Sequence, residues 1–237
     1  VVTREGAIAW SGSRFHQGRP AEALQALGTK LLEEHPDLAE NAVIAATDET
    51  PQFVAADTRA DSVVAAVRTC RHVHPDARAL LMVGGERFFL VRFAVDGSYR
   101  SIRSSSSCAA GTGSFLDQQA RRLDLGPDAH QATAEGTAEL SRRALNSTGD
   151  TPQIASRCSV FAKTDLIHAQ QEGYSLDQIC NGLCQGLARN LINTVTQDAE
   201  LPQPVVFAGG VSRNKAVRVH IESIIGKELI VDAFGHL

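Results

Sequence analysis

The sequence has few cysteines, no long apolar run and no excess of positive charge. Five scattered cysteines in 237 residues do not form the disulfide framework of a secreted domain. Apolar runs such as residues 79–83 are far shorter than the roughly 20 residues of a membrane helix, and no signal region begins the chain. A net charge of -4 with dispersed arginines argues against a nucleic-acid surface. We therefore expect a cytoplasmic protein with reduced thiols and neither a nucleic-acid nor a membrane partner.

Strand and helix patterns alternate along the chain, and this alternation predicts an α/β protein. Apolar residues at helical spacing predict a helix over residues 21–35. Short β runs are expected at residues 79–83, 88–94, 99–103 and 205–208. Most of the chain after residue 108 is predicted to be helical, near residues 112–124, 128–143, 159–171, 175–198 and from 212 onward. We interpret the pattern as two lobes, residues 1–103 and 104–237, each built on a mixed sheet flanked by helices.

Two glycine pairs, Gly84-Gly85 and Gly209-Gly210, each follow a predicted strand. Glycine lets the backbone approach a ligand closely, and a following helix offers free N–H groups to phosphate. One such pair is more often a plain turn, but two pairs with Gly111-Thr112-Gly113 between them favour a nucleotide bound in a cleft between the lobes. Asn214 and Lys215 either face that nucleotide or cap and solvate the last helix.

Two cysteines occur in similar settings. Cys108 lies where a glycine-rich turn opens an amphipathic helix, and Cys158 lies beside a serine at the head of another apolar-periodic segment. Helix N-termini favour thiolates, although burial as a small core residue is the alternative for both. Cys70 lies on the apolar face of a helix predicted over residues 61–72. Cys180 and Cys184 lie beside apolar residues of the helix predicted over residues 175–198, and we expect all three thiols to lie in the core.

Three segments together resemble a known family. They are Cys-Ala-Ala-Gly-Thr-Gly from Cys108, Arg-Cys-Ser-Val-Phe-Ala-Lys-Thr-Asp-Leu-Ile over residues 157–167, and Phe-Ala-Gly-Gly-Val-Ser-Arg-Asn-Lys over residues 207–215. They look like the ATPase activators of 2-hydroxyacyl-CoA dehydratases and benzoyl-CoA reductases, which belong to the acetate kinase, sugar kinase, heat-shock chaperone and actin superfamily. The resemblance implies a two-lobed ribonuclease-H-like (actin-like ATPase) fold that binds ATP or ADP with Mg²⁺. Residues 84–89 and 168–171 look closer to the long, tandem-domain members.

The resemblance also implies a homodimer that holds one [4Fe–4S] cluster between its subunits. Such a cluster usually takes four thiolates, and a twofold axis would present Cys108 and Cys158 twice. ATP would then drive an electron into a partner dehydratase or reductase, and a donor such as ferredoxin or flavodoxin would reload the cluster.

The chain departs from the family pattern at the phosphate loops. The first loop is expected to precede Val1, and Met82 stands where relatives often carry an acid. Glu86-Arg87 stands where many relatives have Gln-Asp, and Glu86 is the remaining candidate for orienting the attacking water. The far end stops before a closing helix, so we expect a fragment truncated at both ends. Two alternatives stay open: a small-molecule kinase of the same superfamily, and a non-catalytic electron-relay or assembly module with a decayed ATP site.

Overall fold

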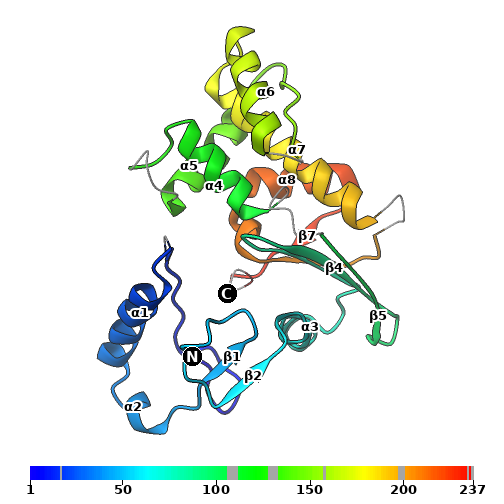
Figure 1. Cartoon of the computed structure of the whole chain (residues 1–237). Coiled ribbons are helices and arrows are strands. Elements are labelled where there is room, and N and C mark those ends of the chain that lie inside the picture. The colour runs from blue at the N-terminus through cyan, green and yellow to red at the C-terminus, as the bar shows by residue number, and fades with distance from the viewer. Residues whose placement is uncertain are drawn as a thin grey trace. The chain divides into compact units, whose positions relative to one another are not determined.

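The chain forms two compact units, residues 1–72 and residues 73–236 (Figure 1). The computed structural model describes residues 1–16, 18–105, 112–127, 133–156, 159–196, 201–233 and 235. The predicted lobe boundary between residues 103 and 104 does not coincide with this division. The strands at residues 79–104 share a sheet with later strands, and they belong to the second unit.

The first unit contains three helices and one small parallel sheet among its described residues. Pro20 begins its longest helix, because the fixed φ of proline suits the first helical position. Arg59 holds the loop between the two strands by donating to backbone carbonyls that include those of Thr50 and Val54. The elements are α1 (Pro20–Glu34), α2 (Leu38–Asn41), β1 (Ala45–Thr47), β2 (Thr58–Ala60) and α3 (Ser62–Val73).

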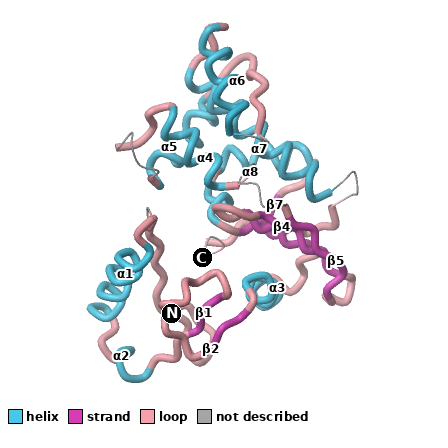
Figure 2. Tube along the Cα trace, viewed as in Figure 1, coloured by secondary structure: helices cyan, strands magenta, loops and turns pink. Residues whose placement is uncertain are grey.

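The second unit is built on a five-stranded mixed sheet in the order β5-β4-β3-β6-β7. Figure 2 shows strands of this sheet, among them β4, β5 and β7, in magenta. Strand β3 pairs antiparallel with β4 and parallel with β6, which lies far along the chain. The strands predicted at residues 79–83, 88–94, 99–103 and 205–208 are all present. The strands are β3 (Ala79–Val83), β4 (Phe88–Phe93), β5 (Tyr99–Ser104), β6 (Val205–Ala208) and β7 (Leu229–Ile230).

Helix α7 packs against strand β4 of this sheet, and it also contacts the helices α5, α6 and α8. Leu183 and Leu187 of α7 are fully buried and share one core cluster with Leu81 and Phe207 of the sheet. None of the described helices combines the length and the apolar character that a bilayer span requires. The helices are α4 (Gly113–Arg122), α5 (Ala134–Asn146), α6 (Ser159–Gln171), α7 (Leu176–Thr196), the 3-10 turn η1 (Gly210–Arg213) and α8 (Lys215–Ile225).

Candidate functional site

The two glycine pairs lie at the same edge of one sheet. Because β3 and β6 are parallel neighbours with Met82 opposite Ala208, their carboxyl ends meet, and each end runs into a glycine pair. A Cβ atom added to Gly209 would overlap the carbonyl oxygen of Val83 and lie 2.6 Å from its carbonyl carbon, and the φ angle of Gly209 is 87°. Only glycine allows this approach. The expectation of one pair in each lobe is therefore corrected: both belong to the second unit.

The turn at Gly84-Gly85 is braced by the start of α4. The Gly84 N–H group donates to the carbonyl oxygen of Arg87 at 2.9 Å and tightens the turn between β3 and β4. The N–H groups of Gly113 and Ser114 donate to the carbonyl oxygens of Gly84 and Gly85, each at 2.8 Å. The Ser114 hydroxyl also donates to Gly85. These two N–H groups of α4 are thus used in a contact between turn and helix, so they are not free to receive phosphate.

Unobstructed backbone lies at Gly85 and Gly210. A Cβ atom added to either residue would meet no atom within 4 Å. Glu86 is exposed beside Gly85, whereas Thr112 is fully buried at the start of α4. Gly111, the remaining residue of the predicted glycine motif, lies outside the described residues. A ligand would therefore meet open main chain at the ends of both β3 and β6.

Asn214 caps α8 and joins it to α7. Its Oδ1 atom accepts from the Val217 N–H group at 3.0 Å and from the Cys184 thiol at 3.9 Å. The Asn214 side chain is buried, and its Nδ2 atom has no hydrogen-bond partner among the described residues. Lys215 is exposed at the first position of the helix. The capping alternative therefore describes Asn214, while Lys215 leaves its charge open to solvent.

The described cysteines are unlike metal ligands. Burial raises the pKa of Cys70 to about 11 and of Cys180 to about 12, and it raises the pKa of Cys184 as well. Protonated core thiols bind metal poorly. Within the described ranges, no three His, Cys, Asp or Glu side chains gather to hold a metal ion. Cys108 and Cys158 lie outside the described residues.

The segments that flank those two cysteines are well anchored. Helix α4 begins shortly after Cys108, α6 begins directly after Cys158, and the two helices contact each other. The Ser156 hydroxyl donates to the Gly186 carbonyl oxygen at 2.7 Å, and a Cβ atom on Gly186 would lie 2.6 Å from the Ile154 carbonyl oxygen. Because Gly186 has no side chain, the segment that leads to Cys158 packs directly against the backbone of α7.

Asp117 was not predicted as a site residue. It lies on α4 one turn after Gly113, and therefore on the same face of the helix. Burial raises the pKa of its carboxyl group from 3.8 to about 6. The sequence signal was a carboxylate within Gly-Ser-Phe-Leu-Asp, directly after the thiol motif. Carboxyl groups with a perturbed pKa cluster at functional sites, so Asp117 is a candidate beside Glu86.

Replacing Asp117 by asparagine should stabilise the protein at neutral pH. Because folding raises the pKa, ionisation of Asp117 opposes folding, and this cost grows as the pH rises from 3.8 to about 6. After discounting for solvent screening, we expect Asp117→Asn to gain roughly 1 kcal/mol above that range and nothing below it. Urea unfolding of both proteins across this pH range measures the difference. An asparagine variant that is less stable at neutral pH would show that the carboxylate makes a favourable contact.

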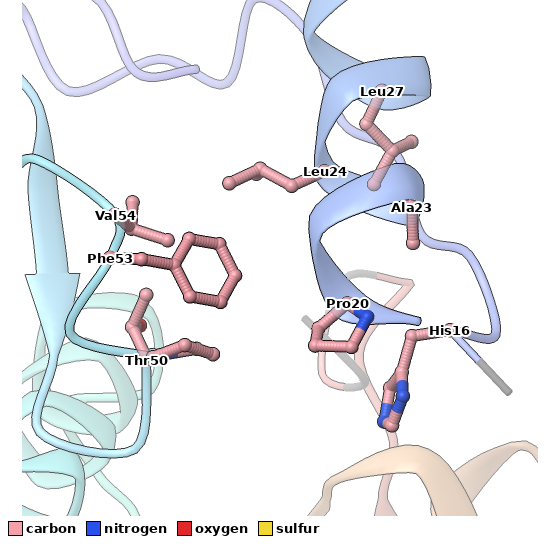
Figure 3. Close-up of a pocket in the computed structure, with 9 residues that line it drawn as sticks. His16, Pro20, Ala23, Leu24, Leu27, Thr50, Phe53 and Val54 are labelled. Atoms are coloured by element: carbon pink, nitrogen blue, oxygen red, sulfur yellow. The ribbon is translucent and has the colours of Figure 1, made fainter. Parts of the chain in front are cut away.

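The first unit has a separate apolar hollow of about 210 Å³ (Figure 3). Helix α1 contributes Leu24 and Leu27, and Phe53 and Val54 lie on the opposite wall. Apart from His16 and Thr50, the lining offers few side-chain groups that could bind the phosphates or ribose of a nucleotide. The carboxyl ends of β3 and β6, rather than this hollow, are therefore the candidate nucleotide site.

Comparisons with known proteins show similarity to an ATPase family and to activators of CoA dehydratases. The model of the BadF/BadG/BcrA/BcrD ATPase family matches residues 28–233. The chain is 30% identical to the activator of lactoyl-CoA dehydratase of Anaerotignum propionicum over 157 residues, which are 66% of this chain and 56% of that protein. It is 25% identical to the 2-hydroxyisocaproyl-CoA dehydratase activator of Clostridioides difficile over 176 residues, which are 74% of this chain and 62% of that protein. The chain thus matches less than two thirds of the length of these two relatives.

A solved structure shows the same fold. The activator of the 2-hydroxyisocaproyl-CoA dehydratase from Clostridium difficile, with bound ADPNP, superposes with a TM-score of 0.77 at 23% identity. The match covers 96% of this chain and 79% of that chain. The expected α/β fold of the actin-like ATPases is confirmed.

Proposed function

Because the chain belongs to the BadF/BadG/BcrA/BcrD ATPase family, we propose that it is an ATP-dependent activator of a CoA-ester enzyme. In this proposal it binds ATP or ADP with Mg²⁺ and passes one electron from an iron–sulfur cluster to a partner acyl-CoA dehydratase or reductase. An electron donor such as ferredoxin or flavodoxin reloads the cluster. A cytoplasmic location would keep the thiols reduced.

The observation that carries the proposal is the pair of open glycine turns on adjacent parallel strands. Ligands of α/β sheets bind at the carboxyl ends of the strands, where Gly85 and Gly210 leave the main chain accessible. The exposed Lys215 side chain at the first position of α8 supplies positive charge beside this edge. The Clostridium difficile activator with the same fold contains ADPNP.

ATP hydrolysis at this edge needs positioning and charge stabilisation rather than covalent catalysis. Glu86 is exposed at the turn after β3, and Asp117 lies on the helix that braces this turn. We assign these two carboxylates as the candidates for orienting water or Mg²⁺. A pKa of about 6 leaves most of Asp117 ionised at neutral pH, as a magnesium ligand requires.

For the cluster we propose Cys108 and Cys158 from each subunit of a homodimer. The other three thiols are buried and protonated, so they do not fit a site between subunits. The helices that follow Cys108 and Cys158 contact each other, which favours a common location for the two motifs. A [4Fe–4S] cluster bound there would supply one-electron transfer.

Helix α7 offers a route between the two sites. Cys184 on this helix donates to Asn214 beside the Gly209-Gly210 turn, and Gly186 seats the segment that leads to Cys158. The two contacts lie within one turn of the same helix. We propose that nucleotide binding shifts α7 and thereby the segment before Cys158.

Anaerobic phosphate release separates this function from its alternatives. Basal hydrolysis, or hydrolysis stimulated by a CoA-ester dehydratase or reductase, is the expected result. ATP consumption only in the presence of a small phosphate acceptor would instead assign a kinase. A protein that retains its cluster but releases no phosphate under either condition would assign a relay module.

A further inference from the structure

Strand β5 is the outer strand of the sheet, and its outward backbone groups have no strand partner among the described residues. The Ser105 N–H group donates to the Phe88 carbonyl oxygen at 2.9 Å, which fixes the phase of the ladder with β4. Alternation then turns the N–H group of Arg103 toward β4 and those of Ile102 and Ser104 outward. An edge of this kind is a template for an additional strand.

Three arginines gather at this edge. Arg100 and Arg103 are exposed on β5, and Arg92 lies on β4, where a bulge shifts the register. Partial burial lowers the pKa of Arg92, and the charges of Arg103 and then Arg100 lower it further. Arg92 donates to the Val195 carbonyl oxygen at 3.3 Å, and no ion pair to a carboxylate is found for the three arginines within the described ranges. The edge therefore carries uncompensated positive charge.

The chemistry of the edge selects the occupant. A second copy of β5 would bring the same arginines to this edge and supply no carboxylate, so the positive charges would repel one another. Nucleic acid requires a longer basic surface than three residues in a chain of net charge -4. Tyr99 and Ile102 are 59% and 38% exposed and add apolar contact along the same strand. An extended segment that alternates acidic and apolar residues would satisfy both the charges and the apolar contacts.

We propose that the β5 edge binds an acidic, extended segment of a partner protein by strand addition. The segment pairs with the outward backbone of Ile102 and Ser104 and places carboxylates on Arg100 and Arg103. This assignment does not depend on the nucleotide site or on the cluster.

The test uses a capped peptide that alternates valine and glutamate, measured by fluorescence anisotropy at low and high salt. We expect the wild-type protein to bind it and the double variant Arg100→Glu, Arg103→Glu to lose about ten-fold or more in affinity. Arg121→Glu makes the same type of charge change at an exposed position on α4 and should leave binding unchanged. Ile102→Pro removes an outward N–H group without removing a bond to β4, and it should also weaken binding.

Several results would overturn the proposal. One is absence of peptide binding to a folded wild-type protein, and another is equal binding of a valine–lysine peptide. Unchanged binding in a folded Ile102→Pro protein would refute strand addition. A single-stranded oligonucleotide that binds more tightly and responds to the same charge reversal would reassign the edge to nucleic acid.

Discussion

Replacing Cys158 by serine is expected to remove the iron from protein prepared without oxygen, and Cys108→Ser is expected to do the same. In the proposed dimer each substitution removes two of the four thiolates, and serine does not replace them for a [4Fe–4S] cluster. Iron and sulfide analysis, together with the visible absorption of the cluster, measures the loss. The effect should be nearly complete rather than partial.

Cys180→Ala is the matched control for these variants. Cys180 is fully buried on α7 with a raised pKa, so its removal should leave the iron content unchanged. Circular dichroism checks that all three variants fold. Full iron in a folded Cys158→Ser protein would contradict the shared-cluster proposal.

Gly210→Val should abolish measurable ATP binding while leaving the protein folded. An added Cβ atom at Gly210 meets nothing within 4 Å, so the fold tolerates it, but the branched side chain would fill the space that the nucleotide needs. We expect a loss of about 100-fold or more in affinity, equivalent to about 2.7 kcal/mol. Calorimetric titration with ATP and Mg²⁺ provides the measurement.

Two neighbouring glycines are the controls. A methyl group at Gly84 would lie 3.3 Å from the Arg87 carbonyl oxygen, within the turn rather than in open space. Because it would not fill the space proposed for the nucleotide, Gly84→Ala should have a smaller effect on ATP affinity than Gly210→Val. Gly209→Ala would overlap the backbone of Val83 and should destabilise the fold itself. If folded Gly210→Val binds ATP with unchanged affinity, the glycine pair is only a turn.

Local patterns in the sequence predicted the elements of the second unit well. The alternation of apolar residues located β3 and β6, and the glycines after them were identified as candidate ligand turns. The parallel pairing of β3 with β6 could not be predicted, because it joins segments that most of the unit separates in the chain. For that reason the predicted boundary between residues 103 and 104 separates two glycine pairs that belong to one sheet.

The environments of individual side chains also could not be predicted from the sequence. Asp117 follows the thiol motif closely in the sequence, but its pKa is raised because the folded structure buries its carboxyl group. The N–H group of Gly113 was expected near phosphate, yet it donates to Gly84 because the turn after β3 packs on the start of α4. For Asn214, the sequence offers helix capping as one alternative, and the side chain does cap α8. Its contact with Cys184 depends on how α7 and α8 pack and could not be predicted.

The most direct test of the account is the iron and sulfide content of the wild-type protein, purified without oxygen and measured together with its oligomeric state. The account predicts a dimer with about four irons and four sulfides per two chains. A dimer without iron, or four irons in each chain, would contradict it.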